Sequence, residues 1–166
     1  ESRRKLHTAA HLALRSTQDV FGRMKALAAD ISDDAESVRV AAELETGIDP
    51  YAVCEVDRRM RSFVLRDSPV RATKAKSIDA AENEFGDLLR VSDRYSFKGK
   101  VRIVVIDGID ANPCSGLHAP SSNIGPYVMI PRAKASSRTI DVDIVLSGAW
   151  MYWFGEGACS PRFIQE

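Results

Sequence analysis

The chain is poor in the residues that most often carry chemistry. It has three histidines and three cysteines among 166 residues, and it has no run of about 18 apolar residues. The cysteines are too few and too unevenly spaced for a disulfide framework, which favours a reducing compartment. The missing apolar run argues against a membrane span. We therefore predict a cytoplasmic protein with no membrane partner.

An excess of charge of either sign is also lacking. Lys plus Arg and Asp plus Glu both number 23, so the overall balance gives no sign of a nucleic-acid binder. Such a partner would have to meet local basic clusters, at residues 3–5, 58–61, 71–76 and 132–138. Each cluster has a plainer interpretation as a solvated face. We infer no obligate protein partner.

Three common catalytic motifs are missing. The chain has no G-x-S-x-G, no G-x-x-x-x-G-K-[ST] and no G-x-G-x-x-G, which argues against a hydrolase elbow, a P-loop and a dinucleotide fold. Its length and its apolar content of 45% fit a single domain over residues 1–166.

The three histidines and one cysteine form two pairs with the same spacing. His7 and His11 are four residues apart, and so are Cys114 and His118. On a helix this spacing places two imidazoles on one face, where both can reach one ion. Three imidazoles and a thiolate make a tetrahedral set that suits zinc, whereas calcium and magnesium want oxygen. A single buried histidine or cysteine is more often a core residue, and that alternative stays open.

Hydrophobic periodicity predicts an α+β chain. Apolar residues at three- and four-residue steps predict a long helix from Leu6 to Ala28, ended by the polar stretch 30–34. Further helices are predicted from Asp49, with Pro50 in the first turn, and from Ser77. Alternation or β-branched runs predict strands at 38–44, 70–75, 101–106, 127–130 and 140–146, the last two as an antiparallel hairpin.

Two segments outside these elements have an unusual composition. Residues 107–113 read as a loop because of their Gly, Pro, Asn and Asp content, and they follow the strand 101–106 directly. From about residue 147 the chain is atypical, with four aromatics in residues 150–154. This aromatic segment is either a terminal element that covers the core or a surface for base stacking or a partner. We expect Cys54 and Cys159 to be ordinary thiols.

The paired motifs carry a resemblance. His7-Thr-Ala-Ala-His11, the strand 101–106, Cys114-x-Gly-x-His118 and Ser-Ser-Asn-Ile-Gly125 together resemble the editing domain of alanyl-tRNA synthetases and the free-standing AlaX proteins. The editing domain of threonyl-tRNA synthetase is a more distant relative. The resemblance covers about Leu6 to Ile130. It implies an α+β fold in which a long helix packs over a curved antiparallel sheet.

The resemblance also implies an activity and its residues. Such domains hydrolyse the ester of a mischarged tRNA, and alanyl-type members remove serine or glycine from alanine tRNA. His7, His11, Cys114 and His118 match the family's zinc ligands and are the expected catalytic residues. Thr8 matches a position beside the aminoacyl pocket. Together with Asp110, Gly116 and Leu117 it is expected to bind the substrate, the acceptor end of a mischarged tRNA.

Departures from the family pattern keep other functions open. Leu117 stands where the family usually has Thr, and the family's pocket strand is not recognisable between Val20 and Leu44. One alternative is an enzyme of the same fold that hydrolyses or transfers a different aminoacyl group in a biosynthetic pathway. The other is a non-catalytic binding module in which zinc only staples the helix to the loop.

Overall fold

The computed structural model describes residues 1–45, 47, 52–91, 96–131 and 138–148. Among them are helices and strands in a mixed order, and the predicted α+β class is confirmed. The elements are α1 (Ser2–Phe21), β1 (Met24–Ile31), β2 (Ser37–Leu44), α2 (Ala52–Leu65), β3 (Val70–Ala75), α3 (Ile78–Phe85), the 3₁₀ turn η1 (Gly86–Leu88), β4 (Val101–Ile106), β5 (Asp110–Pro113), β6 (Tyr127–Pro131) and β7 (Thr139–Leu146).

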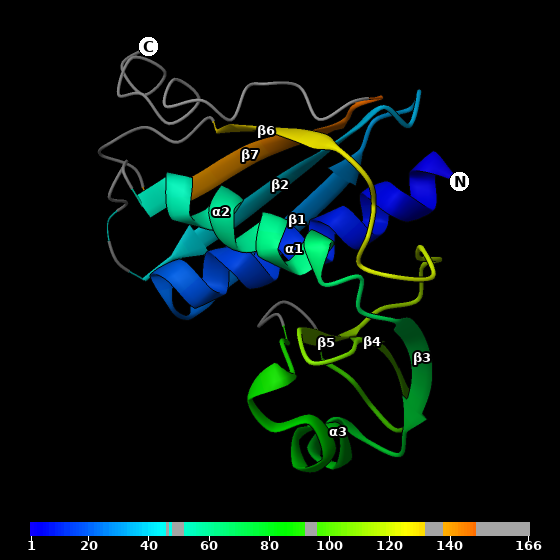
Figure 1. Cartoon of the computed structure of the whole chain (residues 1–166). Helices are drawn as coiled ribbons and strands as arrows, with labels where there is room; N and C mark the ends of the chain where they lie inside the picture. Colours follow the sequence, from blue (N-terminus) through cyan, green and yellow to red (C-terminus); the bar gives the residue numbers. More distant parts are fainter. Residues whose placement is uncertain (46, 48–51, 92–95, 132–137, 149–166) are drawn as a thin grey trace.

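The larger sheet has four antiparallel strands in the order β1-β2-β7-β6. Helix α1 packs against this sheet and α2 packs against α1 (Figure 1). The predicted strands at 38–44, 127–130 and 140–146 are confirmed, and β6 and β7 pair antiparallel as expected. Alternate residues of β2 are buried, because one face of the sheet is covered by the helix.

The first helix is shorter than the sequence predicts. It ends at Phe21, and Gly22 follows with φ +82°, a conformation that side chains with a Cβ rarely adopt. Residues Met24–Ile31 form strand β1 and pair with β2, so the predicted helical continuation to Ala28 is wrong. Over a run this short, the apolar spacing fits both the helical and the strand period. Pairing with β2, whose residues alternate between buried and exposed, makes this segment a strand.

A smaller sheet carries the second half of the site. It has the order β3-β4-β5, all antiparallel, and α3 contacts its strand β3. The strand predicted at 101–106 is confirmed, and so is its central position. The prediction that residues 107–113 form only a loop is wrong in part, because Asp110–Pro113 pairs with β4 as β5. A turn at Gly108, with φ +67°, reverses the chain between these strands.

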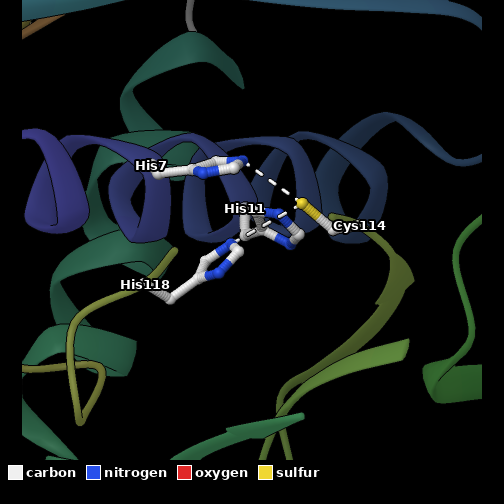
Figure 2. A group of neighbouring side chains, drawn as sticks. All are labelled: His7, His11, Cys114 and His118. Carbon is white, nitrogen blue, oxygen red and sulfur yellow. Dashed lines mark hydrogen bonds between the residues drawn. The ribbon is translucent and has the colours of Figure 1, made fainter. Parts of the chain in front are cut away.

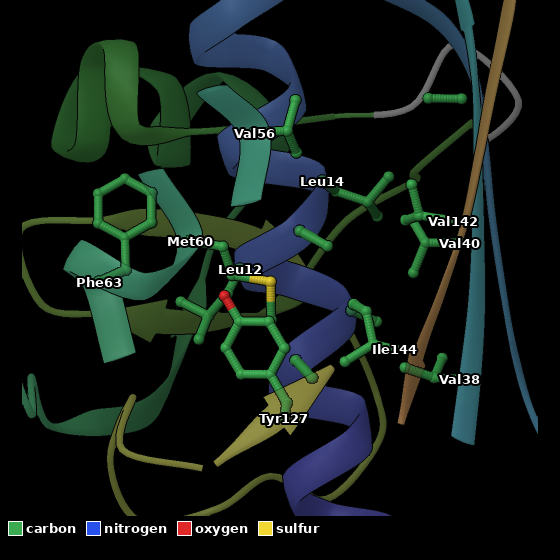
Figure 3. Packing of buried hydrophobic residues seen from close by; sticks show 14 of the residues in the cluster. Leu12, Leu14, Val38, Val40, Val56, Met60, Phe63, Tyr127, Val142 and Ile144 are labelled. Atoms are coloured by element: carbon green, nitrogen blue, oxygen red, sulfur yellow. The ribbon is translucent and has the colours of Figure 1, made fainter. Parts of the chain in front are cut away.

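The main core lies between α1, α2 and the larger sheet. Figure 3 shows Leu12 and Leu14 between side chains of α2, such as Met60, and those of the sheet, such as Val40. Each of these four side chains is buried, with 7% or less of its surface exposed. Removing a side chain of this kind from water is worth about 1.5–3 kcal/mol. This packing fixes α1, which carries half of the candidate site.

No helix among the described residues is long and apolar enough to span a membrane. Cys114 is a free thiol, whereas Cys54 is disulfide-bonded, so the prediction of an ordinary thiol at Cys54 is wrong. The predicted helix start at Asp49 and Pro50 and the aromatic segment 150–154 lie outside the described residues.

Candidate metal centre

Helix α1 presents two imidazoles on one face. His7 and His11 lie one helical turn apart, and their ring centroids are 5.4 Å apart. His11 is buried and 5% exposed, whereas His7 is half-buried at the edge of the packed surface. Figure 2 shows both rings on the side of α1 that faces Cys114 and His118. The i, i+4 expectation for this pair is confirmed.

The other two donors come from the loop that follows β5. Alternation in β5 places Asp110 and Asn112 on one face of the smaller sheet, and the pairing of Cys114 N–H with the Arg102 carbonyl at 3.1 Å continues this register. The Arg102 guanidinium also donates Nη1 to the carbonyls of Cys114 and Gly116, at 2.6 and 3.1 Å. The side chain of Arg102 therefore holds the loop in place.

The four side chains converge on a common point. His7, His11, Cys114 and His118 each offer a donor atom, and these atoms all lie within 4.8 Å of one another. Cys114 Sγ is 3.3 Å from His7 Nε2 and 3.9 Å from His118 Nε2. Tetrahedral zinc with its usual bond lengths would separate its ligands by about 3.3–3.6 Å. The donor set and its spacing therefore fit zinc.

Gly116 makes this convergence possible. An added Cβ at this position would overlap the His7 ring at Cε1 and Nδ1. The loop backbone thus passes directly against an imidazole, which only glycine allows. His7 and His118 also stack, with ring centroids 4.1 Å apart.

Behind His11 lies a buried ion pair. Asp110 is fully buried, and its carboxylate accepts hydrogen bonds from Arg90 Nε at 3.2 Å and Arg90 Nη2 at 3.0 Å. Its Oδ2 is also 3.3 Å from His11 Nδ1. With Nδ1–H donated to Asp110, the His11 Nε2 lone pair is free for an ion. This is the carboxylate–histidine arrangement that orients metal ligands in proteins.

The site shifts the pKa values of its own groups. Burial raises the pKa of the Cys114 thiol, but contacts with His11, His118 and His7 outweigh it and lower the pKa to about 3. Burial lowers the pKa of His11, and the hydrogen bond to Asp110 outweighs it, so that pKa is raised. The pKa of His118 is lowered, chiefly by burial. A thiolate is the form of cysteine that binds metal.

The four residues predicted to bind substrate occupy different places. Thr8 is buried, donates its hydroxyl to the Arg4 carbonyl at 3.1 Å and accepts the Ala119 N–H at 3.0 Å, so it ties α1 to the loop. Asp110 is buried behind His11. Gly116 lines a cleft beside the donors, and the next residue, Leu117, is 63% exposed. Their roles toward a substrate stay predictions.

A cleft of about 590 Å³ opens beside the donors. It lies between α1, β1 and the smaller sheet. Its apolar lining includes Leu14, Ala28 and Phe97, and its cations are Arg90, Lys100 and Arg102. His7, His11 and Cys114 also line it. The cleft is large enough for a nucleoside-sized ligand, since small-molecule sites occupy about 300–1,000 Å³.

Comparison with known proteins points to one kind of enzyme. The chain is 26% identical over 117 residues to an alanine–tRNA ligase of Onion yellows phytoplasma (strain OY-M), which covers 70% of this chain and 13% of the ligase. It is 28% identical over 75 residues to the alanine–tRNA ligase of Aster yellows witches'-broom phytoplasma (strain AYWB), covering 45% and 9%. No protein-family model matches. The chain is thus distantly similar to a small part of alanine–tRNA ligases.

Two residues of the site were not found from the sequence. Arg90 lies in a stretch with no clear periodicity, and nothing in the chain around it marks its pairing with Asp110. Arg102 does leave a signal, because it is a charged residue inside the β-branched run of β4. A cation in a central strand needs a partner, and here the partners are the carbonyls of the loop that carries Cys114.

Proposed function

We propose that this protein hydrolyses the ester bond of a mischarged tRNA, alanine tRNA that carries serine or glycine. The observation that carries the proposal is the convergence of His7, His11, Cys114 and His118 at a cleft with cationic walls. The similarity to part of alanine–tRNA ligases supports the same substrate class. Charged tRNA is made in the cytoplasm, and we place the reaction there.

The cleft has the composition that an aminoacylated adenosine needs. Leu14, Ala28 and Phe97 offer apolar surface to a base or a ribose, and the ring of Phe97 can stack on a base. Lys100 and Arg102 offer positive charge to the phosphate that precedes the terminal nucleoside. The ester would then lie beside the donors of α1 and the 114–118 loop.

The donors fit zinc, which when bound supplies Lewis acidity toward an ester carbonyl or a water. The chain's own residues prepare this site. Asp110 holds His11 in one tautomer, and the imidazoles hold Cys114 as a thiolate. Arg102 fixes the loop through its carbonyls, and Gly116 lets that loop lie against His7. An aminoacyl ester is already activated, so positioning and charge supply much of what its hydrolysis requires.

Leu117 favours a second candidate function. It is 63% exposed next to His118 and offers no hydroxyl to a serine side chain. A site discriminates for a hydroxyl strongly only when it has polar groups to pair with it. The same donors therefore also suit an enzyme that hydrolyses or transfers a different aminoacyl group, one without a hydroxyl in its side chain.

The test is deacylation of a panel of charged tRNAs by the purified protein. The panel consists of alanine tRNA charged with serine, glycine or alanine, and threonine tRNA charged with serine. We expect fast loss of one mischarged species and loss of that activity in His11→Ala. Cys114→Ser serves as a second variant, and Asp107→Asn on the surface serves as the control that keeps full activity. No loss of any species by the wild-type protein would overturn the proposal and move the search to other aminoacyl esters.

A further inference from the structure

Three lysines lie in β3 or directly beside the ends of β3 and β4. In the β3–β4 pair, Lys74 lies directly opposite Arg102. Residues opposite each other in an antiparallel pair share a face, so Lys74 is on the face of Arg102. Lys76 follows Lys74 by two residues and Lys100 precedes Arg102 by two. All three lysines are exposed.

This face is also the face of the candidate metal centre. Arg102 holds the carbonyls of Cys114 and Gly116, and the row of the sheet that starts at Lys74 continues through Arg102 to Cys114. Lys100 and Arg102 line the cleft itself. Lys74 therefore shares a face with Arg102, Lys100 lines the cleft, and Lys76 lies directly after the end of β3. These four residues, here called the basic strip, lead from β3 to the cleft.

The basic strip differs from the arginines of α2 and from Arg71 on the other face of β3. On α2, Arg58 pairs with Glu55, Arg59 with Asp19 and Arg61 with Asp57. On the other face of β3, Arg71 pairs with Asp107. Within the described part of the chain, the three lysines of the strip form no ion pair with a carboxylate. Their charge is available to an external anion.

We propose that the basic strip binds the phosphates of the acceptor strand of an RNA and leads its 3′ end into the cleft. The inference rests on the proposed function, which requires an RNA end at the donors. Exposed lysines make point-charge contacts to phosphates that are independent of base sequence. A chain with no net charge must concentrate such contacts locally, and this strip is continuous with the cleft.

The experiment compares two double variants that remove the same charge. Lys74→Gln with Lys76→Gln changes the strip outside the cleft lining, and Arg58→Gln with Arg59→Gln changes α2. Each is tested with an acceptor-stem minihelix, charged with the amino acid that the wild-type protein removes fastest, and with the same amino acid esterified to adenosine alone. The adenosine ester has no phosphate for the strip to bind.

For the strip variant we expect KM on the charged minihelix to rise about tenfold and the slope of log affinity against log salt to fall by roughly 1.5. Hydrolysis of the adenosine ester should be unchanged, and the α2 variant should match the wild type on both substrates. An unchanged KM in the strip variant, or an equal rise in the α2 variant, would overturn the inference.

Binding of uncharged minihelix separates this inference from the proposed function. If the wild-type protein hydrolyses no ester, fluorescence anisotropy still measures minihelix affinity. Weaker binding by the strip variant alone would support the strip while the hydrolase proposal fails. Equal binding by both variants, or equal competition by a polyglutamate peptide of the same charge, would overturn the strip as an RNA site.

Discussion

The carboxylate of Asp110 joins His11 to Arg90. Its Oδ2 lies 3.3 Å from His11 Nδ1 and 3.0 Å from Arg90 Nη2, and all three side chains are buried. Desolvation raises the pKa of Asp110, but the charge of Arg90 and the bond to His11 outweigh it and keep the pKa below its ordinary value. The carboxylate is therefore ionised, and it ties a candidate metal ligand to a fixed cation.

Asp110→Asn should weaken both metal binding and the fold. Loss of the partner that orients a metal-bound histidine typically lowers metal affinity by about 10- to 100-fold. The buried Arg90 is left without its carboxylate, which should cost about 3 kcal/mol in the free energy of unfolding. Zinc affinity by chelator competition and urea unfolding measure the two effects. Asp107→Asn removes an exposed pair with Arg71 and should change unfolding by less than about 1 kcal/mol.

In the metal-free protein, Cys114 should titrate far below an ordinary thiol. Burial raises its pKa, but the three imidazoles lower it to about 3. Because the folded-state pKa is below that of the unfolded chain, the thiolate stabilises the fold fully above the unfolded value, and this contribution is lost as the pH falls through about 3. Ultraviolet absorbance of the thiolate, with Cys114→Ser as the blank, follows the titration. A midpoint near pH 8.5, that of a free cysteine, would contradict this.

Much of this arrangement is readable from the sequence, and the reasons differ from one element to another. The pairs His7–His11 and Cys114–His118 predict a cluster because residue type and spacing are both restrictive. The strand 101–106 is clear because β-branched residues follow one another without interruption. The helix predicted through Ala28 is wrong because Gly22 ends α1, and short apolar runs do not distinguish a helix from a strand.

The residues that support the donors are harder to predict. Thr8 is expected beside an aminoacyl pocket, yet in the structure its hydroxyl bonds to the Arg4 carbonyl and the Ala119 N–H. Arg90 reaches Asp110 across twenty residues, and no periodicity in the sequence marks that contact. Tertiary pairing of buried polar groups depends on the path of the whole chain, which local pattern does not contain.

Thr8 gives a test of that supporting role. Thr8→Val keeps the shape but leaves the buried Ala119 N–H without its acceptor, and we expect a loss of about 1–3 kcal/mol in the free energy of unfolding. Thr8→Ser keeps the hydroxyl and should retain most of the stability. Thermal or urea unfolding of the two variants measures this difference in stability. A Thr8→Val protein of normal stability with a raised KM would instead favour contact with the substrate.

The close approach of Gly116 to His7 gives the sharpest test of the metal centre. In Gly116→Ala the new methyl group would overlap the His7 ring, so either the ring or the loop has to move. Displacing one of four donors should lower zinc affinity by at least tenfold, in the range seen when ligand support is lost. Gly47→Ala is the matched control, because no atom of the described residues lies within 4 Å of the Cβ that it adds.

The two glycine variants also separate a catalytic ion from a structural one. If zinc takes part in hydrolysis, Gly116→Ala should lose deacylation even at zinc concentrations and temperatures where the protein stays folded. If zinc only staples α1 to the loop, saturating zinc should restore both the melting temperature and the activity. Equal zinc affinity in the Ala variants of Gly116 and Gly47 would mean that His7 is not a ligand, and the donor set would then be His11, Cys114 and His118.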